Sequence, residues 1–302
     1  MFEEFKNAFD RPNSGHTQLI IINVAIFLIM GVLFVFSKIS GLDAVFVTFY
    51  DQFSIPPQIF DFLRKPWTII SYSFAHHFNY VHASVDILHI LFNMLFLYWF
   101  GKLFIEYLGS DKLIALYLLG ALSAGVCYLL VFNTIPYFKN QADFPGMVGA
   151  SGAVYAIMVA TATLVPNYTF YLLLFGPIKI KYIAGFYIVL SFLGSVGTNA
   201  GGNIAHLGGA LMGFIYIKQL QAGVNWGGWI TSTLEWFKDL FKPKAKVKVT
   251  YRKYDTSNGK KNATVSGISQ KEIDEILDKI SDGGYESLTK EEKEKLFKAS
   301  KK

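Results

Sequence analysis

Six apolar stretches separated by polar segments make up most of the first 220 residues of the chain. A helix needs roughly 20 predominantly apolar residues to cross the hydrocarbon core of a bilayer. The pattern predicts membrane-spanning helices at residues 19–36, 87–104, 113–132, 151–164, 182–193 and 203–217. Pro166 ends the fourth helix. The apolar residues before the fifth are interrupted by Gly176 and Pro177, so the pattern does not define where that helix begins. No small-residue cleavage pattern follows the first stretch, which is therefore predicted to be a retained span.

Beyond the sixth stretch, the pattern changes from continuous apolar runs to amphipathic ones. Residues 226–241 are predicted to form a helix that lies along the membrane surface. Later, apolar residues at helical spacing predict a helix that ends at Gly283, and Thr289-x-x-Glu292 predicts the capping box of a final helix. We therefore expect four parts: an N-terminal segment at 1–18, a six-helix membrane domain at 19–220, an interfacial helix with a basic linker at 221–268, and a helical hairpin at 269–302.

The composition agrees with an all-α polytopic membrane protein. Of the 302 residues, 52% are hydrophobic and 17% are charged, whereas roughly 25% of an average soluble domain is charged. Cys127 is the single cysteine, so the chain cannot form an internal disulfide bond.

The positive charge lies mainly in the tail, where 17 of the 28 lysine and arginine residues fall within residues 238–302. Basic residues flanking membrane spans are retained in the cytoplasm, so we expect a cytoplasmic C-terminus and, with six spans, a cytoplasmic N-terminus as well. The basic stretch favours anionic membrane lipids, by about 1 kcal/mol per charge near the surface. A membrane-tethered stretch of this kind argues against nucleic-acid binding.

This topology places four polar residues at one depth in the membrane. The second, fourth and sixth spans all begin on the outer side, near His89, Ser151 and His206 respectively. Asn93 lies one turn below His89 on the same helix face. Polar and ionisable residues inside a membrane are costly to bury, so their convergence indicates a functional site that opens to the outer side.

A serine and a histidine suggest nucleophilic chemistry at this depth. A serine hydroxyl becomes an effective nucleophile when a base removes its proton, and His206 is the only histidine in the last three spans. No acidic residue in those spans is placed to orient it, so the pair is interpreted as a dyad. Tyr155 lies one turn from Ser151 and could stack on the imidazole. The backbone N–H groups around Gly149 and Ser151, together with His89 and Asn93, could stabilise an oxyanion.

Each of these residues also has a simpler interpretation. Gly-x-Ser-Gly in a membrane helix commonly serves tight packing, and buried polar side chains often join helices by hydrogen bonds. A zinc site built from His76, His77, His82, His89 and His206 is disfavoured, because no His-Glu-x-x-His spacing is present. The three histidines in the loop before the second span are expected to be solvated or interfacial.

In combination, these residues resemble the rhomboid intramembrane serine proteases over about residues 66–218. The matching motifs are His89-x-x-x-Asn93, Gly149-x-Ser151-Gly152 with Tyr155, Ala205-His206-x-x-Gly209-x-x-x-Gly213, and Gly101, Glu106 and Gly109. One departure is Pro66-Trp67-Thr68, where the family often carries Trp-Arg in its first loop. The tail resembles those of rhomboids from Bacteroidetes-type bacteria.

The resemblance implies a six-helix rhomboid bundle with a small helical cytoplasmic tail, in a bacterial inner membrane. It implies Ser151 as nucleophile, His206 as general base, and an oxyanion hole formed by His89, Asn93 and the Ser151 N–H. Gly149, Gly152 and Tyr155 would support the site, and Gly209 and Gly213 would let the sixth helix approach the fourth.

The implied substrates are single-span membrane proteins, and no cofactor or metal is implied. The tail could bind a cytoplasmic partner. The alternatives are a catalytically inactive relative that binds transmembrane helices and, less compatible with the serine and histidine, a small-solute channel or transporter.

Overall fold

The computed structural model describes residues 6–9, 13–79, 84–139, 146–172, 176–241 and 270–300. The chain divides into two compact units, Met1–Lys242 and Pro243–Lys302, and each is described by itself.

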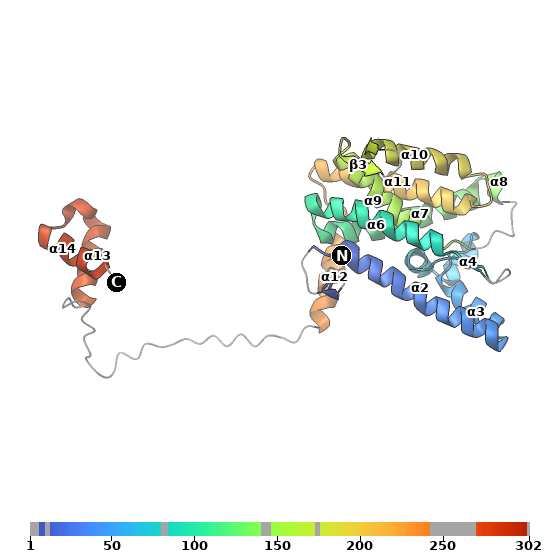
Figure 1. The fold of residues 1–302 in the computed structure, drawn as a ribbon, viewed down its shortest axis with the longest axis horizontal. Helices are drawn as coiled ribbons and strands as arrows, with labels where there is room; N and C mark the ends of the chain where they lie inside the picture. The colour runs from blue at the N-terminus through green and yellow to red at the C-terminus, as the bar shows by residue number, and fades with distance from the viewer. Residues whose placement is uncertain are drawn as a thin grey trace. The chain divides into compact units, whose positions relative to one another are not determined.

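The first unit is a helical bundle built around a short central helix. Its main helices are α2 (Gly15–Ser40), α6 (Ile87–Leu108), α7 (Ser110–Thr134), α9 (Ser151–Leu164), α10 (Ile180–Gly194) and α11 (Ala200–Gln221). Helix α9 buries ten of its 14 residues, because α6, α7 and α11 surround it (Figure 1). Helix α10 buries three of its 15 residues and lies at the edge of the bundle.

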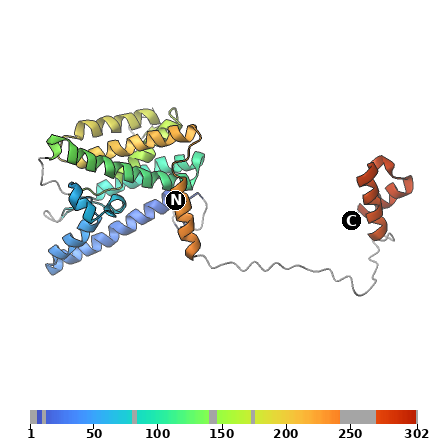
Figure 2. The ribbon, with the colours of Figure 1, turned by 180° about the vertical axis from the view of Figure 1, so that it is seen from behind.

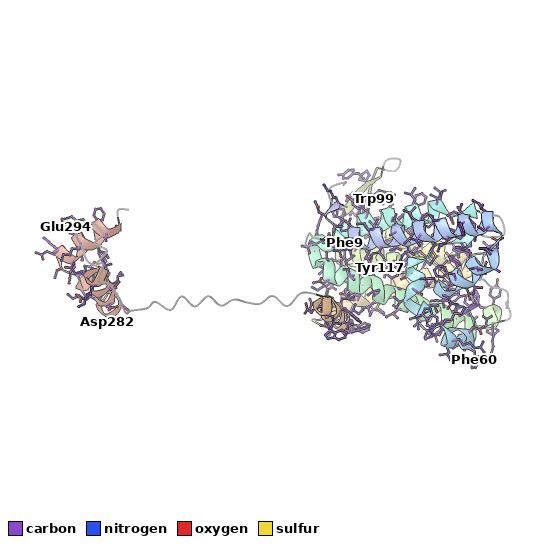
Figure 3. All side chains as sticks on the ribbon, turned by 90° about the horizontal axis from the view of Figure 1, so that it is seen from below. Phe9, Phe60, Trp99, Tyr117, Asp282 and Glu294 are labelled. Carbon is purple, nitrogen blue, oxygen red and sulfur yellow. The ribbon has the colours of Figure 1, made fainter. Side chains whose placement is uncertain are left out.

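The outer surface of the bundle is rich in large apolar side chains. Phe60 and Trp99 lie on the outside, whereas Tyr117 is enclosed within the bundle (Figure 3). Among the described residues, α2, α6 and α7 are long and apolar enough to cross a membrane, and α9 and α10 are apolar but shorter. The chain is thus a mostly helical membrane protein, and the count of six spans stays a prediction.

Small residues determine how closely α9 and α11 pack. A Cβ atom at Gly209 would overlap the carbonyl oxygen of Gly152, and one at Gly213 would overlap that of Ala156. Small residues in membrane helices allow such close backbone contact. The predicted close approach of these two helices is therefore present in the structure.

The connections contain short elements that the apolar pattern did not predict. Between α2 and α6 lie α3 (Asp43–Tyr50), η1 (Asp51–Phe53), α4 (Ile59–Arg64), α5 (Thr68–Ser71), η2 (Tyr72–Phe74) and the paired strands β1 (Phe78–Asn79) and β2 (Ser84–Val85). Helix α8 (Pro136–Lys139) follows α7. The antiparallel strands β3 (Thr169–Leu172) and β4 (Gly176–Lys179) occupy the apolar residues before α10. The structure is mostly helical, as the all-α prediction has it, and the two short hairpins are additions to that prediction among the described residues.

The predicted helices of the tail are also present. Helix α12 (Gly228–Phe241) belongs to the first unit and is the last element described there (Figure 2). The second unit contains α13 (Gln270–Gly283), η3 (Tyr285–Ser287) and α14 (Lys290–Ser300). At the start of α14, the Thr289 N–H donates to the Glu292 carboxylate at 2.8 Å, and the Glu292 N–H donates to Thr289 Oγ1 at 3.3 Å. This is the predicted capping box. The basic linker expected at residues 242–268 lies outside the described residues.

Candidate active site

Ser151 is the first residue of α9, and the loop before it is tied to the rest of the bundle. Ile55 and Met147 exchange two backbone hydrogen bonds, of 3.0 and 2.8 Å, and the Gly149 N–H donates to the Tyr72 carbonyl at 3.0 Å. Gly149 has a φ of +135°, a conformation that residues with a side chain rarely adopt. Ala150 at the N-cap offers no side-chain acceptor to the first N–H groups of α9. Backbone donors thus remain available beside Ser151.

All five polar residues predicted for the site border one cavity of about 420 Å³. Its lining includes His89 and Asn93 from α6, Ser151 and Tyr155 from α9, and His206 from α11. The structure therefore brings together side chains from three helices that are far apart in the sequence. Val154, Met158 and Phe96 supply apolar parts of the same wall.

His206 is held by contacts with α9 and α10, and its other ring nitrogen has no hydrogen-bond partner among the described residues. Its ring stacks on Tyr155 with centroids 4.1 Å apart and planes inclined by 9°. Its Nδ1 lies 3.1 Å from the Ser191 hydroxyl of α10. Its Nε2 is buried and has no hydrogen-bond partner among the described residues. Sequence reasoning missed Ser191, because a single serine in an apolar helix carries no signal of its partner.

His89 and Asn93 enter the cavity from the first turns of α6. Asp86 caps this helix, accepting from the His89 N–H at 3.0 Å. The Asn93 amide donates to the His89 carbonyl at 2.8 Å, and its two N–H bonds leave a second donor for another acceptor. The His89 Nε2 lies 3.5 Å from the position that a Cβ atom would take at Gly149. Both side chains are thus close to the backbone that precedes Ser151.

The expectation for the loop histidines was wrong for His76. Only 1% of its surface is exposed, and its ring contacts those of Phe27 and His89, with centroids 5.9 and 6.4 Å away. Burial lowers the pKa of His76 to about 4. His77 is exposed as expected, and His82 lies outside the described residues. Within the described part of the chain, no group of three or more His, Cys, Asp or Glu residues could hold a metal ion.

Two family models match this chain, one over the region that contains the cavity and one over the tail. Residues 63–221, more than half of the chain, match the family model described as the Rhomboid domain. The chain belongs to the rhomboid family. All the residues that line the cavity fall within the matched region. Residues 267–302 match a second model, described as a family of unknown function (DUF6576).

Individual rhomboids from a plant and a bacterium are similar to the same region. RHOMBOID-like protein 12, mitochondrial, of Arabidopsis thaliana is 35% identical over 168 residues, which cover 52% of this chain and 47% of the plant protein. Rhomboid protease GlpG of Haemophilus influenzae is 28% identical over 159 residues, covering 50% of this chain and 67% of GlpG. Rhomboid-like protein 16, chloroplastic, of Arabidopsis thaliana is 28% identical over 172 residues, covering 52% of this chain and 49% of that protein. The matched region thus spans about half the length of the two plant relatives.

Proposed function

We propose that this rhomboid is a serine endopeptidase that cleaves transmembrane proteins in or near the membrane. The observation that carries the proposal is the shared cavity: Ser151 and His206 both line it, and His206 Nε2 has no hydrogen-bond partner among the described residues. Membership of the rhomboid family is compatible both with intramembrane proteases and with inactive relatives. The chain retains both a serine and a histidine at the cavity, which favours the active alternative.

In the proposed reaction, His206 Nε2 accepts the proton of the Ser151 hydroxyl as the oxygen attacks a peptide carbonyl. The resulting imidazolium donates that proton to the departing amine, which leaves an acyl-enzyme. Water then attacks the ester with His206 again as base, releasing the acid and regenerating Ser151. No step requires a metal ion or a cofactor, because a hydroxyl, an imidazole and water balance every proton transfer.

The tetrahedral intermediate needs donors for its negative oxygen. The Ser151 N–H at the start of α9, the His89 ring and the second N–H of Asn93 are the groups we assign to this role. Gly149 and Gly152 support the nucleophile: Gly149 adopts a φ of +135° that residues with a side chain rarely adopt, and a Cβ atom at Gly152 would overlap that of Ala124 in α7. Tyr155 supports the base through its stacked ring.

The membrane arrangement completes the proposal. We infer six spans in the region 19–220, with both termini in the cytoplasm of a bacterial inner membrane and the cavity open to the outer side. The apolar outer surface is compatible with lipid contact. Residues 221–268 would form the interfacial helix and basic linker, and residues 269–302 a cytoplasmic hairpin that could bind a partner protein.

A fluorophosphonate probe, which reacts covalently with activated serines, tests the proposal directly. We expect the purified protein in detergent micelles to be labelled, and Ser151→Ala and His206→Ala to abolish labelling. Ser195→Ala is the control, since Ser195 is the half-buried C-cap residue of α10 and its hydroxyl bonds only the Phe192 carbonyl among the described residues. Absence of labelling in a folded wild-type protein would instead favour a binding protein for transmembrane helices. Comparing ectodomains released by cells with wild type or Ser151→Ala would identify substrates.

A further inference from the structure

Ser191 occupies a position that the proposed reaction does not yet explain. It is 1% exposed and is one of three buried residues on α10, together with Ile180 and Ala184. Its hydroxyl donates to the Tyr155 hydroxyl at 3.0 Å and lies 3.1 Å from His206 Nδ1. One side chain of α10 therefore contacts both rings of the stacked pair.

The hydrogen bonds that join Tyr155, Ser191 and His206 fix where the imidazole carries its proton. A serine hydroxyl carries one hydrogen and can donate to only one of its two neighbours. When that hydrogen points to Tyr155, the Ser191 oxygen is an acceptor, and His206 Nδ1 must carry the proton that fills the contact. A neutral imidazole has a single N–H, so Nε2 is then unprotonated. This is the tautomer that can accept the proton of Ser151.

The opposite orientation would disable the base. If Ser191 donated to Nδ1, the proton of the neutral imidazole would reside on Nε2, the nitrogen that has no partner among the described residues. In the structure the Ser191 hydroxyl donates to the Tyr155 hydroxyl instead, which leaves its oxygen, and not its hydrogen, for Nδ1. The stacking of the two rings keeps the imidazole edge directed at Ser191.

We propose that Ser191 is a positioning residue for the general base: it accepts from His206 Nδ1–H, donates to Tyr155, and so leaves Nε2 free to act on Ser151. This inference rests on the proposed function for its catalytic consequence. The tautomer itself can be measured whether or not the protein is a protease.

A purely structural role for Ser191 predicts a different outcome. Its hydroxyl could simply connect α10 to α9 and α11, as polar side chains do in membrane proteins. Removing it would then lower stability without changing which nitrogen of His206 carries the proton. The two roles are separated by a spectroscopic signature of the imidazole together with the rate of serine modification.

The first experiment is nitrogen NMR of the full-length protein, labelled with ¹⁵N-histidine, in detergent micelles at a pH where His206 is neutral. The His206 signals are assigned by their loss in His206→Gln. We expect the proton on Nδ1 in wild type and in Ser195→Ala, and a mixture of both tautomers in Ser191→Ala. Ser191→Thr, which keeps the hydroxyl, should preserve the wild-type tautomer. Tyr155→Phe removes the acceptor and should move proton population to Nε2, which provides a second test if Ser191→Ala does not fold.

The second experiment measures the rate of fluorophosphonate labelling of the same proteins. The free energy of one neutral hydrogen bond corresponds to a roughly three- to tenfold change in rate. Ser191→Ala should therefore be labelled more slowly by that factor, and Ser191→Thr at a rate close to that of wild type. An unchanged tautomer in Ser191→Ala and Tyr155→Phe, with labelling at the wild-type rate, would overturn the inference. An unlabelled wild type whose tautomer still responds to Ser191→Ala would refute the protease and retain the positioning role.

Discussion

The contact between α9 and α11 allows a quantitative prediction, because Gly209 lies one turn after His206 and faces the residue next to Ser151. In Gly209→Ala, the new methyl group would overlap the carbonyl oxygen of Gly152. Non-bonded atoms are stable at separations of about 3.5–4 Å, so the two helices must separate locally by about 1 Å or more. That displacement lies between the proposed nucleophile and its base.

The expected cost has two components. Overpacking a close helix contact destabilises a protein by about 1–3 kcal/mol, and a misplacement of about 1 Å between reacting groups can reduce a rate by about 10²-fold. Gly209→Ala should therefore melt at a lower temperature in detergent and react with a fluorophosphonate about 10²-fold more slowly. Gly213→Ala overlaps the Ala156 carbonyl one turn further from the site. It should lose similar stability but less rate.

Gly185→Ala on α10 is the matched control. A Cβ atom at Gly185 meets nothing within 4 Å, and replacing a helical glycine by alanine favours the helix by up to about 1 kcal/mol. This variant should keep its rate and melt at the wild-type temperature or slightly above it. If Gly209→Ala labels within twofold of wild type and melts at the same temperature, the close approach of α9 and α11 is not what positions the dyad.

Three further predictions concern the loop before α9, the buried histidine and the tail. Gly149→Ala should abolish most fluorophosphonate labelling, because the strained backbone at φ +135° costs about 1–3 kcal/mol and the methyl group would lie 3.6 Å from Ser151 Oγ; wild-type labelling would contradict this. The pKa of His76 is about 4 in the folded protein against 6.5 when unperturbed, so its contribution to stability is complete above about pH 6.5 and is lost as the pH falls towards 4. Between pH 7 and pH 5, the free energy of unfolding from melting curves should fall by about 2 kcal/mol less in His76→Leu than in wild type. An equal fall in both proteins would refute this. Thr289→Ala should destabilise α14 by about 1 kcal/mol, detected as faster amide hydrogen exchange in α14 with no change in α9.

The positions of the main helices could be predicted because long apolar runs have few alternative structures. Helix α9 begins at Ser151 and ends before Pro166, as the pattern indicated. The convergence of Ser151 with His206 followed from topology, since alternate spans begin on the same side of a membrane. The capping box of α14 was predictable because its chemistry is local to four residues.

Features that depend on neighbours distant in the sequence could not be predicted. The β3–β4 hairpin occupies the apolar residues before α10, and periodicity alone cannot separate a short apolar strand from a helix segment. His76 was expected to be solvated or interfacial, but it is buried, with its ring packed against Phe27 from α2. Ser191 is polar in an otherwise apolar helix, and only the placement of α10 beside α11 reveals that it contacts His206.

The same hydrogen bond that orients His206 also contributes to holding α10 in the bundle. Near the N-terminus of α10, the buried residues are the apolar Ile180 and Ala184. Towards its C-terminus, polar contacts join it to α11: Ser191 to His206, and the Gly194 carbonyl to the Asn203 amide at 2.9 Å. If α10 moved away, His206 Nδ1 would lose its partner, and an unsatisfied buried donor costs about 1–3 kcal/mol. The position of α10 and the protonation of the proposed base are therefore energetically linked, so a change that loosens α10 should also slow the reaction of Ser151.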